Sequence, residues 1–105
     1  MIKKRVTASK QSEPKYLLRL YVTGSTPRSA RSILNIRTLC EEKLRNRYEL
    51  EVVDIYQQPQ LAREQQIIAA PTLIKSLPLP LRKLVGDLSD RERVLVGLDL
   101  KPAVG

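Results

Sequence analysis

The sequence predicts one α/β domain, in which a strand, a helix and a strand are followed by a helix, two strands and a C-terminal segment. Three observations predict it. Residues 16–22 form a nearly continuous apolar run, the segment from Pro27 repeats apolar residues at helical spacing, and residues 48–56 are rich in β-formers. The 105 residues, 42% of them hydrophobic, suffice for one modest core.

The first strand and helix are marked by their ends as well as by their apolar pattern. Residues 16–22 match a strand covered on both faces, and Gly24 ends it. Ser25 or Thr26 can cap the next helix, and Pro27 suits its first turn, where amide hydrogens lack partners within the helix. We expect this helix to run to about Asn46. Its buried face is predicted to consist of Ala30, Ile33, Ile36, Cys40 and Leu44. The side chains expected outside are Arg28, Arg31, Glu42, Lys43 and Arg45.

The following segments complete a right-handed crossover and begin the second half. Residues 48–56 predict the second strand, and residues 59–66 predict a short helix, because proline near its start is followed by good helix formers. Pro71 cannot donate to a strand ladder, so it marks the junction before a third strand over 72–75. A proline-rich connection leads to a fourth strand candidate over 81–87, and these two strands could form a hairpin.

The C-terminal segment carries conflicting signals. Ser89 and Glu92 have the spacing of a capping box, which starts a helix. Apolar residues, some of them β-branched, alternate along residues 93–100, as they do in a strand. Gly97 inside a helix would also cost about 1 kcal/mol relative to alanine. The segment is therefore compatible with a helix or a strand, and two packings of one sequence are physically possible.

The basic charge is concentrated in the first residues of the chain. Residues 1–15 contain five basic side chains against one acidic side chain, Glu13, which gives +4 of the formal +8. We expect them to form a flexible arm before a domain over 16–101 and a short tail over 102–105. The arm is either a solvated extension or a weak contact for a polyanion or an acidic partner. No secretory signal or bilayer-spanning run is visible, so a cytoplasmic location is expected.

The residues that most enzyme and metal sites require are missing. The chain has no histidine, one cysteine, no phosphate-binding glycine motif and no cysteine/histidine set for zinc. The order β-α-β-α-β-β-α is the thioredoxin-like arrangement, but thiol exchange needs Cys-X-X-Cys where this chain has Gly24-Ser25-Thr26-Pro27. The carboxylate pairs Glu41-Glu42 and Glu49/Glu51 are expected on the solvated surface. We therefore expect no enzyme activity, no cofactor, no metal, no specific nucleic-acid binding and no membrane contact.

Several motifs together resemble the KaiB circadian-clock family between Tyr16 and Leu100. They are the stretches 16–24, Thr26-Pro27, Asp54, 59–62, 70–73, 86–92 and 94–100. The resemblance implies a KaiB-type fold, with a thioredoxin-like N-terminal β-α-β half and a metamorphic C-terminal half. Its ground state would be a homotetramer or dimer, the tetramer ordered βαββααβ. Its alternative would be a thioredoxin-like βαβαββα monomer, in which the bond before Pro71 should be cis.

The resemblance also implies partners and the residues that serve them. The monomer would bind the ATPase ring of KaiC, modulate its phosphorylation cycle and compete with a kinase like SasA. Gly97 and Asp99 match the pair that biases the fold equilibrium, since a helix-weakening glycine and an acid near a helix C-terminus both penalise the helical form. Positions that match the family's partner contacts are Arg31, Tyr48, Lys75, Arg82 and Lys83.

The chain departs from the family in ways that leave alternatives open. Clock members usually carry an acidic C-terminal tail, whereas this chain stops at Lys101-Pro102-Ala103-Val104-Gly105 and carries a basic arm over residues 1–15. Gln66 stands where the clock member has a lysine used against KaiC. Glu49 and Glu51 lie near the expected KaiA-binding edge, which argues against KaiA as a partner. The alternative is a diverged KaiB-like protein that acts without KaiA on another acidic partner, for example in a stress response.

Overall fold

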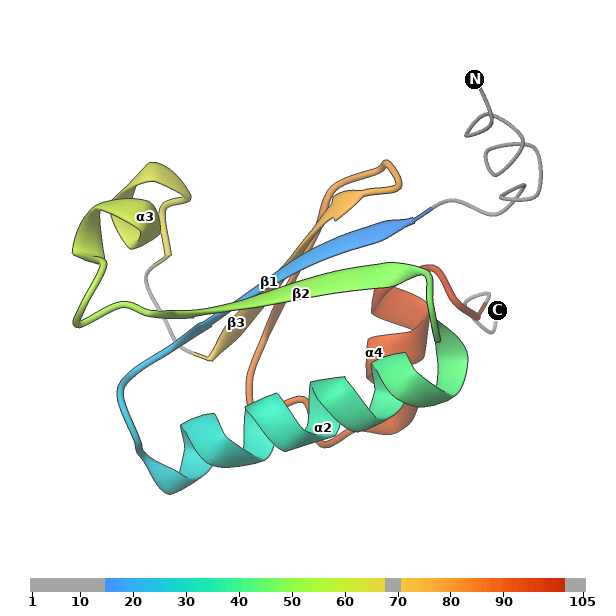
Figure 1. Ribbon diagram of the computed structural model, residues 1–105, viewed down its shortest axis with the longest axis horizontal. Helices are drawn as coiled ribbons and strands as arrows, with labels where there is room; N and C mark the ends of the chain where they lie inside the picture. The colour runs from blue at the N-terminus through green and yellow to red at the C-terminus, as the bar shows by residue number, and fades with distance from the viewer. Residues whose placement is uncertain (1–14, 68–70, 102–105) are drawn as a thin grey trace, which may run out of the picture.

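The computed structural model describes residues 15–67 and 71–101. Its elements follow the thioredoxin-like order, with the C-terminal segment helical (Figure 1). They are β1 (Tyr16–Val22), α2 (Pro27–Lys43), β2 (Tyr48–Asp54), α3 (Pro59–Glu64), β3 (Thr72–Leu77), β4 (Arg82–Val85) and α4 (Arg91–Gly97). The α/β class and the element order expected from the sequence are confirmed. Of the two arrangements that the resemblance implies, the structure has the thioredoxin-like one.

The four strands form one sheet in the order β2-β1-β3-β4. β1 pairs in parallel with β2 and antiparallel with β3, and β3 forms the predicted hairpin with β4. β1 therefore has a strand on both sides, which explains its nearly continuous apolar sequence. β2 and β4 form the two open edges of the sheet.

The helices cover the two faces of the sheet unequally. α2 and α4 lie on one face, whereas α3 sits beyond the end of β2 (Figure 1). The larger core lies under α2 and α4 and includes Leu20, Ile36, Leu73 and Leu98. A smaller cluster on the other face joins Ala62 of α3 to Tyr21, Val53 and Ile74. Much of this second face is consequently left without a helix.

The buried face of α2 differs in part from the one that the apolar pattern predicts. Ile36, Cys40 and Leu44 are buried as expected and Ile33 packs against the core, but Ala30 is exposed, so its assignment was wrong. The buried positions also include two serines and Leu39. Ser29 Oγ accepts from Thr23 N–H at 3.1 Å, and Ser32 Oγ donates to Ser29 O at 2.7 Å. Hydroxyl groups that are satisfied in this way can occupy positions where a sequence pattern expects carbon.

The ends of α2 and β2 are set by polar caps. Thr26, one of the two predicted caps, accepts from Ser29 N–H at 3.1 Å. The helix ends at Lys43 rather than near Asn46, because Leu44 already leaves helical geometry and Asn46 adopts a left-handed conformation. β2 ends at Asp54, two residues early, because the Asp54 carboxylate accepts from the Gly24 and Tyr56 amides and closes a turn.

α4 is capped one residue later than the capping box predicts. Asp90 accepts from the Arg93 amide at 3.2 Å, whereas the Ser89 amide donates to Asp87 Oδ1. The assignment of Ser89 as the cap was therefore wrong, although the helix exists. The reason is that Asp87 has already fixed the preceding turn.

Three expectations fall on residues outside the described ranges. They are residues 1–14 of the arm predicted over 1–15, the tail over 102–105 and the bond between Ala70 and Pro71. Pro71 itself is buried, and its carbonyl accepts from the Gly86 amide at 2.9 Å. None of the helices within residues 15–67 and 71–101 is long and apolar enough to cross a membrane.

Candidate functional site at the junction of β3, β4 and α4

The structure brings together some of the candidate residues and separates others. Lys75 and Arg82 lie on the paired strands β3 and β4, and Asp99 follows α4 closely enough to contact both side chains. Arg31 lies on α2 and Tyr48 at the start of β2, away from this cluster. We call Lys75, Arg82 and Asp99 the charge cluster.

Lys75 occupies the centre of the charge cluster. Its side chain is fully buried, although the resemblance implies a partner contact at this position. Its ammonium group donates to Pro78 O at 2.5 Å and Pro80 O at 2.9 Å, and lies 3.1 Å from Asp99 Oδ2. It also lies 5.8 Å from the centre of the Tyr16 ring. Lys75 therefore ties the β3–β4 loop to the residue that follows α4, and it does not face a partner in this fold.

Asp99 connects the C-terminal end of α4 to Lys75 of β3 and Arg82 of β4. Arg82 binds its carboxylate with two nitrogens, at 3.0 and 3.1 Å, a geometry that favours arginine over lysine. Hydrogen bonds from Arg82 and then Lys75 hold the pKa of Asp99 below its ordinary value. These contacts stabilise the helical form, so they oppose the dipole penalty that the sequence suggests for this residue.

The backbone around Asp99 forms a C-terminal cap. Asp99 has a φ of 62°, its amide donates to Val96 O at 3.0 Å, and the Leu100 amide donates to Leu95 O at 2.8 Å. This pair of bonds is a Schellman motif, in which a left-handed residue ends the helix. The cap fixes where the Asp99 carboxylate lies relative to β4.

Gly97 allows α4 to approach β4 closely. A Cβ atom at this position would lie 2.5 Å from Leu84 Cδ2 and 3.1 Å from Leu84 Cγ. The glycine thus serves packing in this fold, in addition to lowering helix propensity. Sequence reasoning found the second effect and missed the first, because the contact joins positions on different elements.

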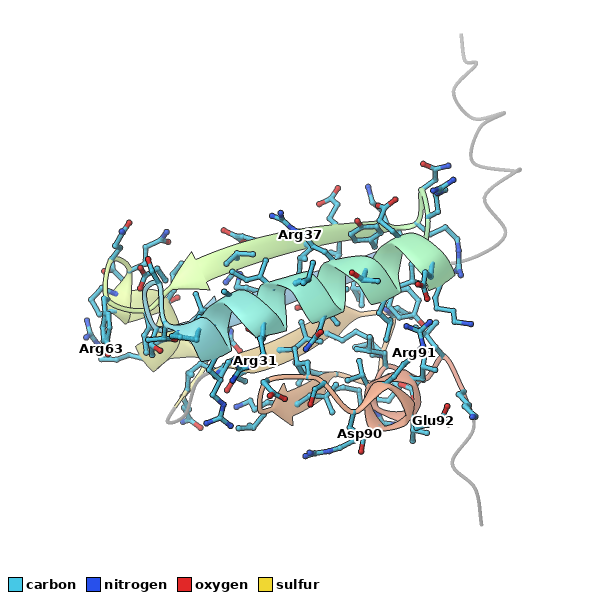
Figure 2. The ribbon with its side chains drawn as sticks, turned by 90° about the horizontal axis from the view of Figure 1, so that it is seen from below. Arg31, Arg37, Arg63, Asp90, Arg91 and Glu92 are labelled. Carbon is cyan, nitrogen blue, oxygen red and sulfur yellow. The ribbon has the colours of Figure 1, made fainter. Side chains whose placement is uncertain are left out.

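The remaining candidate residues make separate contacts. Arg31 is exposed on α2 (Figure 2). It lies 3.8 Å from Asp87, a residue before α4. The pKa of Asp87 is lowered mainly by hydrogen bonding to Ser89, with a smaller contribution from Arg31. Tyr48 donates to Glu41 at 2.6 Å, and this bond raises the pKa of Tyr48 to about 12. Lys83 donates to Gln65 O at 3.2 Å.

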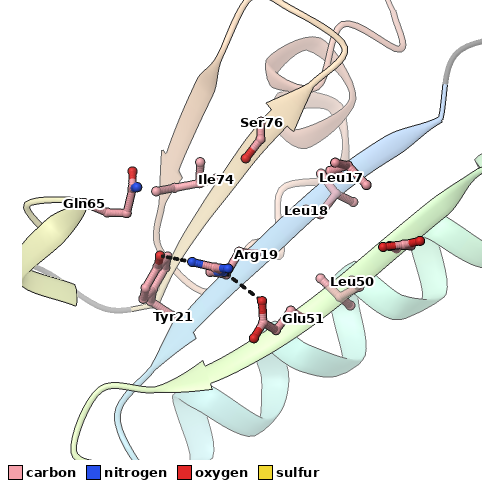
Figure 3. Close-up of a pocket in the computed structure, with 10 residues that line it drawn as sticks. Leu17, Leu18, Arg19, Tyr21, Leu50, Glu51, Gln65, Ile74 and Ser76 are labelled. Atoms are coloured by element: carbon pink, nitrogen blue, oxygen red, sulfur yellow. Dashed lines mark hydrogen bonds and ion pairs between the residues drawn. The ribbon is translucent and has the colours of Figure 1, made fainter. Parts of the chain in front are cut away.

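The face of the sheet opposite α2 has a hollow of about 480 Å³ beside β1 and β2 (Figure 3). Arg19 lies in it, donating to Glu51 at 2.9 Å and to the Tyr21 hydroxyl at 3.3 Å. Glu49 pairs with Lys15 at 2.7 Å. The two glutamates are on the exposed surface, as the sequence predicts, and their charges are already balanced by neighbours. No group of acidic, cysteine or histidine side chains that could hold a metal occurs within residues 15–67 and 71–101.

The charge cluster as a unit was missed by sequence reasoning, although its three members were each named. The available signal was Lys75 itself, a lone charge after the apolar Leu73 and Ile74 in a strand. A buried ammonium group needs a carboxylate or carbonyl partners. The identity of those partners depends on tertiary contacts that join residues up to 24 positions apart, from Lys75 to Asp99.

Comparisons with known proteins agree in sequence and in fold. Residues 19–100 match the model of the KaiB domain. The chain is 53% identical to the circadian clock oscillator protein KaiB of Gloeothece citriformis, over 81% of this chain and 80% of that protein. It is 52% identical to the protein of the same name from a Synechococcus strain, over 81% of this chain and 83% of that one.

Solved structures with the same fold include a SasA domain and a thioredoxin. The N-terminal domain of SasA from Synechococcus elongatus has a TM-score of 0.68 at 23% identity, over 89% of this chain and 91% of that domain. Mitochondrial thioredoxin 3 from Saccharomyces cerevisiae has a TM-score of 0.67 at 13% identity, over 93% of this chain and 90% of that protein. At these identities the likeness describes the fold alone.

Proposed function

Because the chain belongs to the KaiB family, we propose that it is a non-enzymatic regulator of a KaiC-like ATPase. The relatives compared above are circadian clock oscillator proteins. In this proposal the thioredoxin-like arrangement of Figure 1 is the binding form, and binding modulates the phosphorylation cycle of the ATPase. A cytoplasmic location goes with the proposal.

One observation carries this proposal. Residues 91–97 are helical, and the charge cluster holds the end of that helix against β3 and β4. The resulting fold is shared with the SasA N-terminal domain. The shared fold supports competition between this chain and a SasA-like kinase for one surface of the ATPase.

The exposed candidate residues supply the proposed contacts. Arg31, Arg82 and Lys83 are exposed and basic, and Tyr48 presents a half-buried ring at an edge of the sheet. Lys75 acts indirectly, by holding the β3–β4 loop. The exposed Glu49 and Glu51 on β2 argue against KaiA as a further partner.

The alternative fold is part of the proposal. A rearrangement of the second half that gives the chain the βαββααβ order would remove the helix end at which Asp99 meets Lys75 and Arg82. We propose a homotetramer or dimer for that state, with Pro71, Gly97 and Asp99 at the positions that bias the equilibrium. Light scattering of the purified protein, compared with that of the complex, tests whether assembly and ATPase binding exclude each other.

The experiment that tests the function is size-exclusion chromatography with KaiC from the same organism while KaiC hydrolyses ATP. We expect co-elution of the wild-type chain and weaker co-elution of Arg31→Glu. Arg45→Glu is the matched control, since it makes the same charge change on an exposed residue just beyond the other end of α2. Failure of the wild-type chain to co-elute would overturn the proposal.

A second candidate function is favoured by the basic charge of the chain, +8 overall. It is a diverged member of the family that binds another acidic partner without KaiA, for example in a stress response. Pull-down with KaiC of the same organism separates the two candidates. Retention of KaiC favours the first, and loss of KaiC together with binding of a different acidic protein favours the second.

A further inference from the structure

Within residues 15–67 and 71–101, no strand pairs with the outer edge of β4. β4 is the last strand in the order β2-β1-β3-β4. The Gly86 amide bonds to Pro71 O, and antiparallel pairs alternate between bonded and non-bonded, so Leu84 and Arg82 bond to β3. The backbone N–H and C=O groups of Lys83 and Val85 therefore point away from the sheet.

A groove runs between this edge and α4. Its volume is about 720 Å³, and its apolar lining comes from Leu84, Val96, Gly97 and Leu100. Arg82, Asp99 and Lys101 form its polar border. The side chain of Lys83 reaches Gln65 instead. Neighbouring side chains of a strand point to opposite faces, so the side chain of Lys83 points away from the face on which Leu84 lines the groove. Lys83 therefore borders the groove through its main chain.

The charges along the edge indicate what it can accept. Within residues 15–67 and 71–101, Lys83 contacts a carbonyl and no carboxylate. Arg82 pairs with Asp99, and Lys101 pairs with Glu92. Because Lys83 has no such carboxylate partner in the described ranges, its positive charge is the excess charge of the edge. Cations on an edge strand oppose pairing with a second copy of the same strand. They favour a strand that carries carboxylates.

We propose that the open edge of β4 binds an extended acidic segment of a partner protein as an added strand. The outward groups of Lys83 and Val85 provide the main-chain hydrogen bonds. Alternate apolar side chains of the segment enter the groove over Leu84 and Val96, and the intervening carboxylates face Lys83 on the other side. The site requires α4 to be helical and does not depend on binding of an ATPase.

The test uses the full chain and two short peptides that alternate valine with glutamate or valine with lysine. Backbone NMR titration should show shifts at Lys83, Val85, Val96 and Leu100 with the glutamate peptide. The glutamate peptide should bind about tenfold or more tightly than the lysine peptide, as expected for reversing several charges next to a cationic edge. Equal binding of the two peptides, or shifts on β2 instead, would overturn the proposal.

Two variants separate main-chain pairing from general charge attraction. Val85→Pro removes an outward amide without removing a bond to β3, and it should abolish binding. Lys83→Glu should weaken binding about tenfold, while Arg45→Glu, with the same charge change on a distant exposed residue, should not. Should Val85→Pro not fold, the pair Lys83→Glu and Arg45→Glu still decides. An equal loss of peptide binding in Lys83→Glu and Arg45→Glu would contradict the proposed site. A wild-type dimer that Val85→Pro dissociates would also contradict it, because the edge would then pair with a second copy of the chain.

Discussion

In the N-terminal half, β1, α2 and β2 meet mainly through apolar side chains, whereas in the C-terminal half β3, β4 and α4 add a buried lysine and its carboxylate to their apolar contacts. Leu20, Ile36 and Leu39 fill the first interface. In the second, Val94 and Leu95 of α4 are buried, but the end of the helix is held by Asp99. The stabilisation from apolar burial does not depend on direction, whereas that from an ion pair depends on the positions of the two charged groups and on their protonation. The second half is therefore the one that a change of charge can release.

Leu20→Ala gives the largest expected effect, because it creates a cavity in the central strand. Leu20 is fully buried. We expect a loss of about 3 kcal/mol in the free energy of unfolding. Denaturant unfolding measures it, and hydrogen exchange should rise in both halves. The control is Leu34→Ala, at a side chain that is 66% exposed, with an expected change below about 0.5 kcal/mol. Similar losses in the two variants would show that β1 is not the shared core.

Lys75→Met tests whether the second half depends on the charge cluster. The methionine fills a similar volume, but it leaves two loop carbonyls without their donor and Asp99 with Arg82 alone. We expect a loss of about 2 kcal/mol, below the range for a fully buried pair because Asp99 is partly exposed. Hydrogen exchange should rise more in β4 and α4 than in α2. Lys83→Met, at an exposed lysine on the neighbouring strand, is the control, and an equal effect there would contradict a special role for Lys75.

Asp99→Asn removes the charge and keeps a side chain that tolerates a left-handed backbone. The lowered pKa of Asp99 means that its contribution to stability is present above its unfolded pKa of about 4 and is lost as pH falls through the folded value. We therefore expect the variant to be less stable than wild type near neutral pH, and the difference to vanish in acid. Urea unfolding at several pH values measures this. Glu64→Gln, the same change of acid to amide at an exposed residue of α3, is the control. A pH-independent difference for Asp99→Asn would contradict the ion pairs.

The two halves also differ in how far the sequence predicts them. The first half follows from local signals: an apolar run, the Thr26 cap and Pro27 give β1 and the start of α2 to the residue, although α2 ends earlier than predicted. In the second half, residues 93–100 satisfy both a strand and a helix pattern, and tertiary contacts decide between them. The contacts from Lys75 to Asp99 and from Gly97 to Leu84 join separate elements, so no periodicity reveals them. The resemblance named the positions, but only the geometry shows what they touch.

Gly97→Ala gives the smallest expected effect, because two contributions oppose each other. Gly97 is the last residue of α4, and alanine exceeds glycine in helix propensity by up to about 1 kcal/mol, the value for a helix interior. Its Cβ also meets Leu84, which must shift to make room. We expect little net change in the free energy of unfolding of the wild-type background. The contribution of helix propensity can be separated from that of the Leu84 contact in a variant that lacks the Leu84 side chain.

A double-mutant cycle with Leu84→Ala makes that separation. Without the Leu84 side chain, Gly97→Ala should stabilise the chain by about 0.5–1 kcal/mol, the propensity difference. The coupling between the two sites should then reach at least about 0.5 kcal/mol, as expected for residues in contact. Additive effects would mean that Gly97 acts through helix propensity alone, as sequence reasoning holds. A measurable coupling would mean that the glycine also sets how closely α4 can approach β4, and hence where Asp99 meets Lys75 and Arg82.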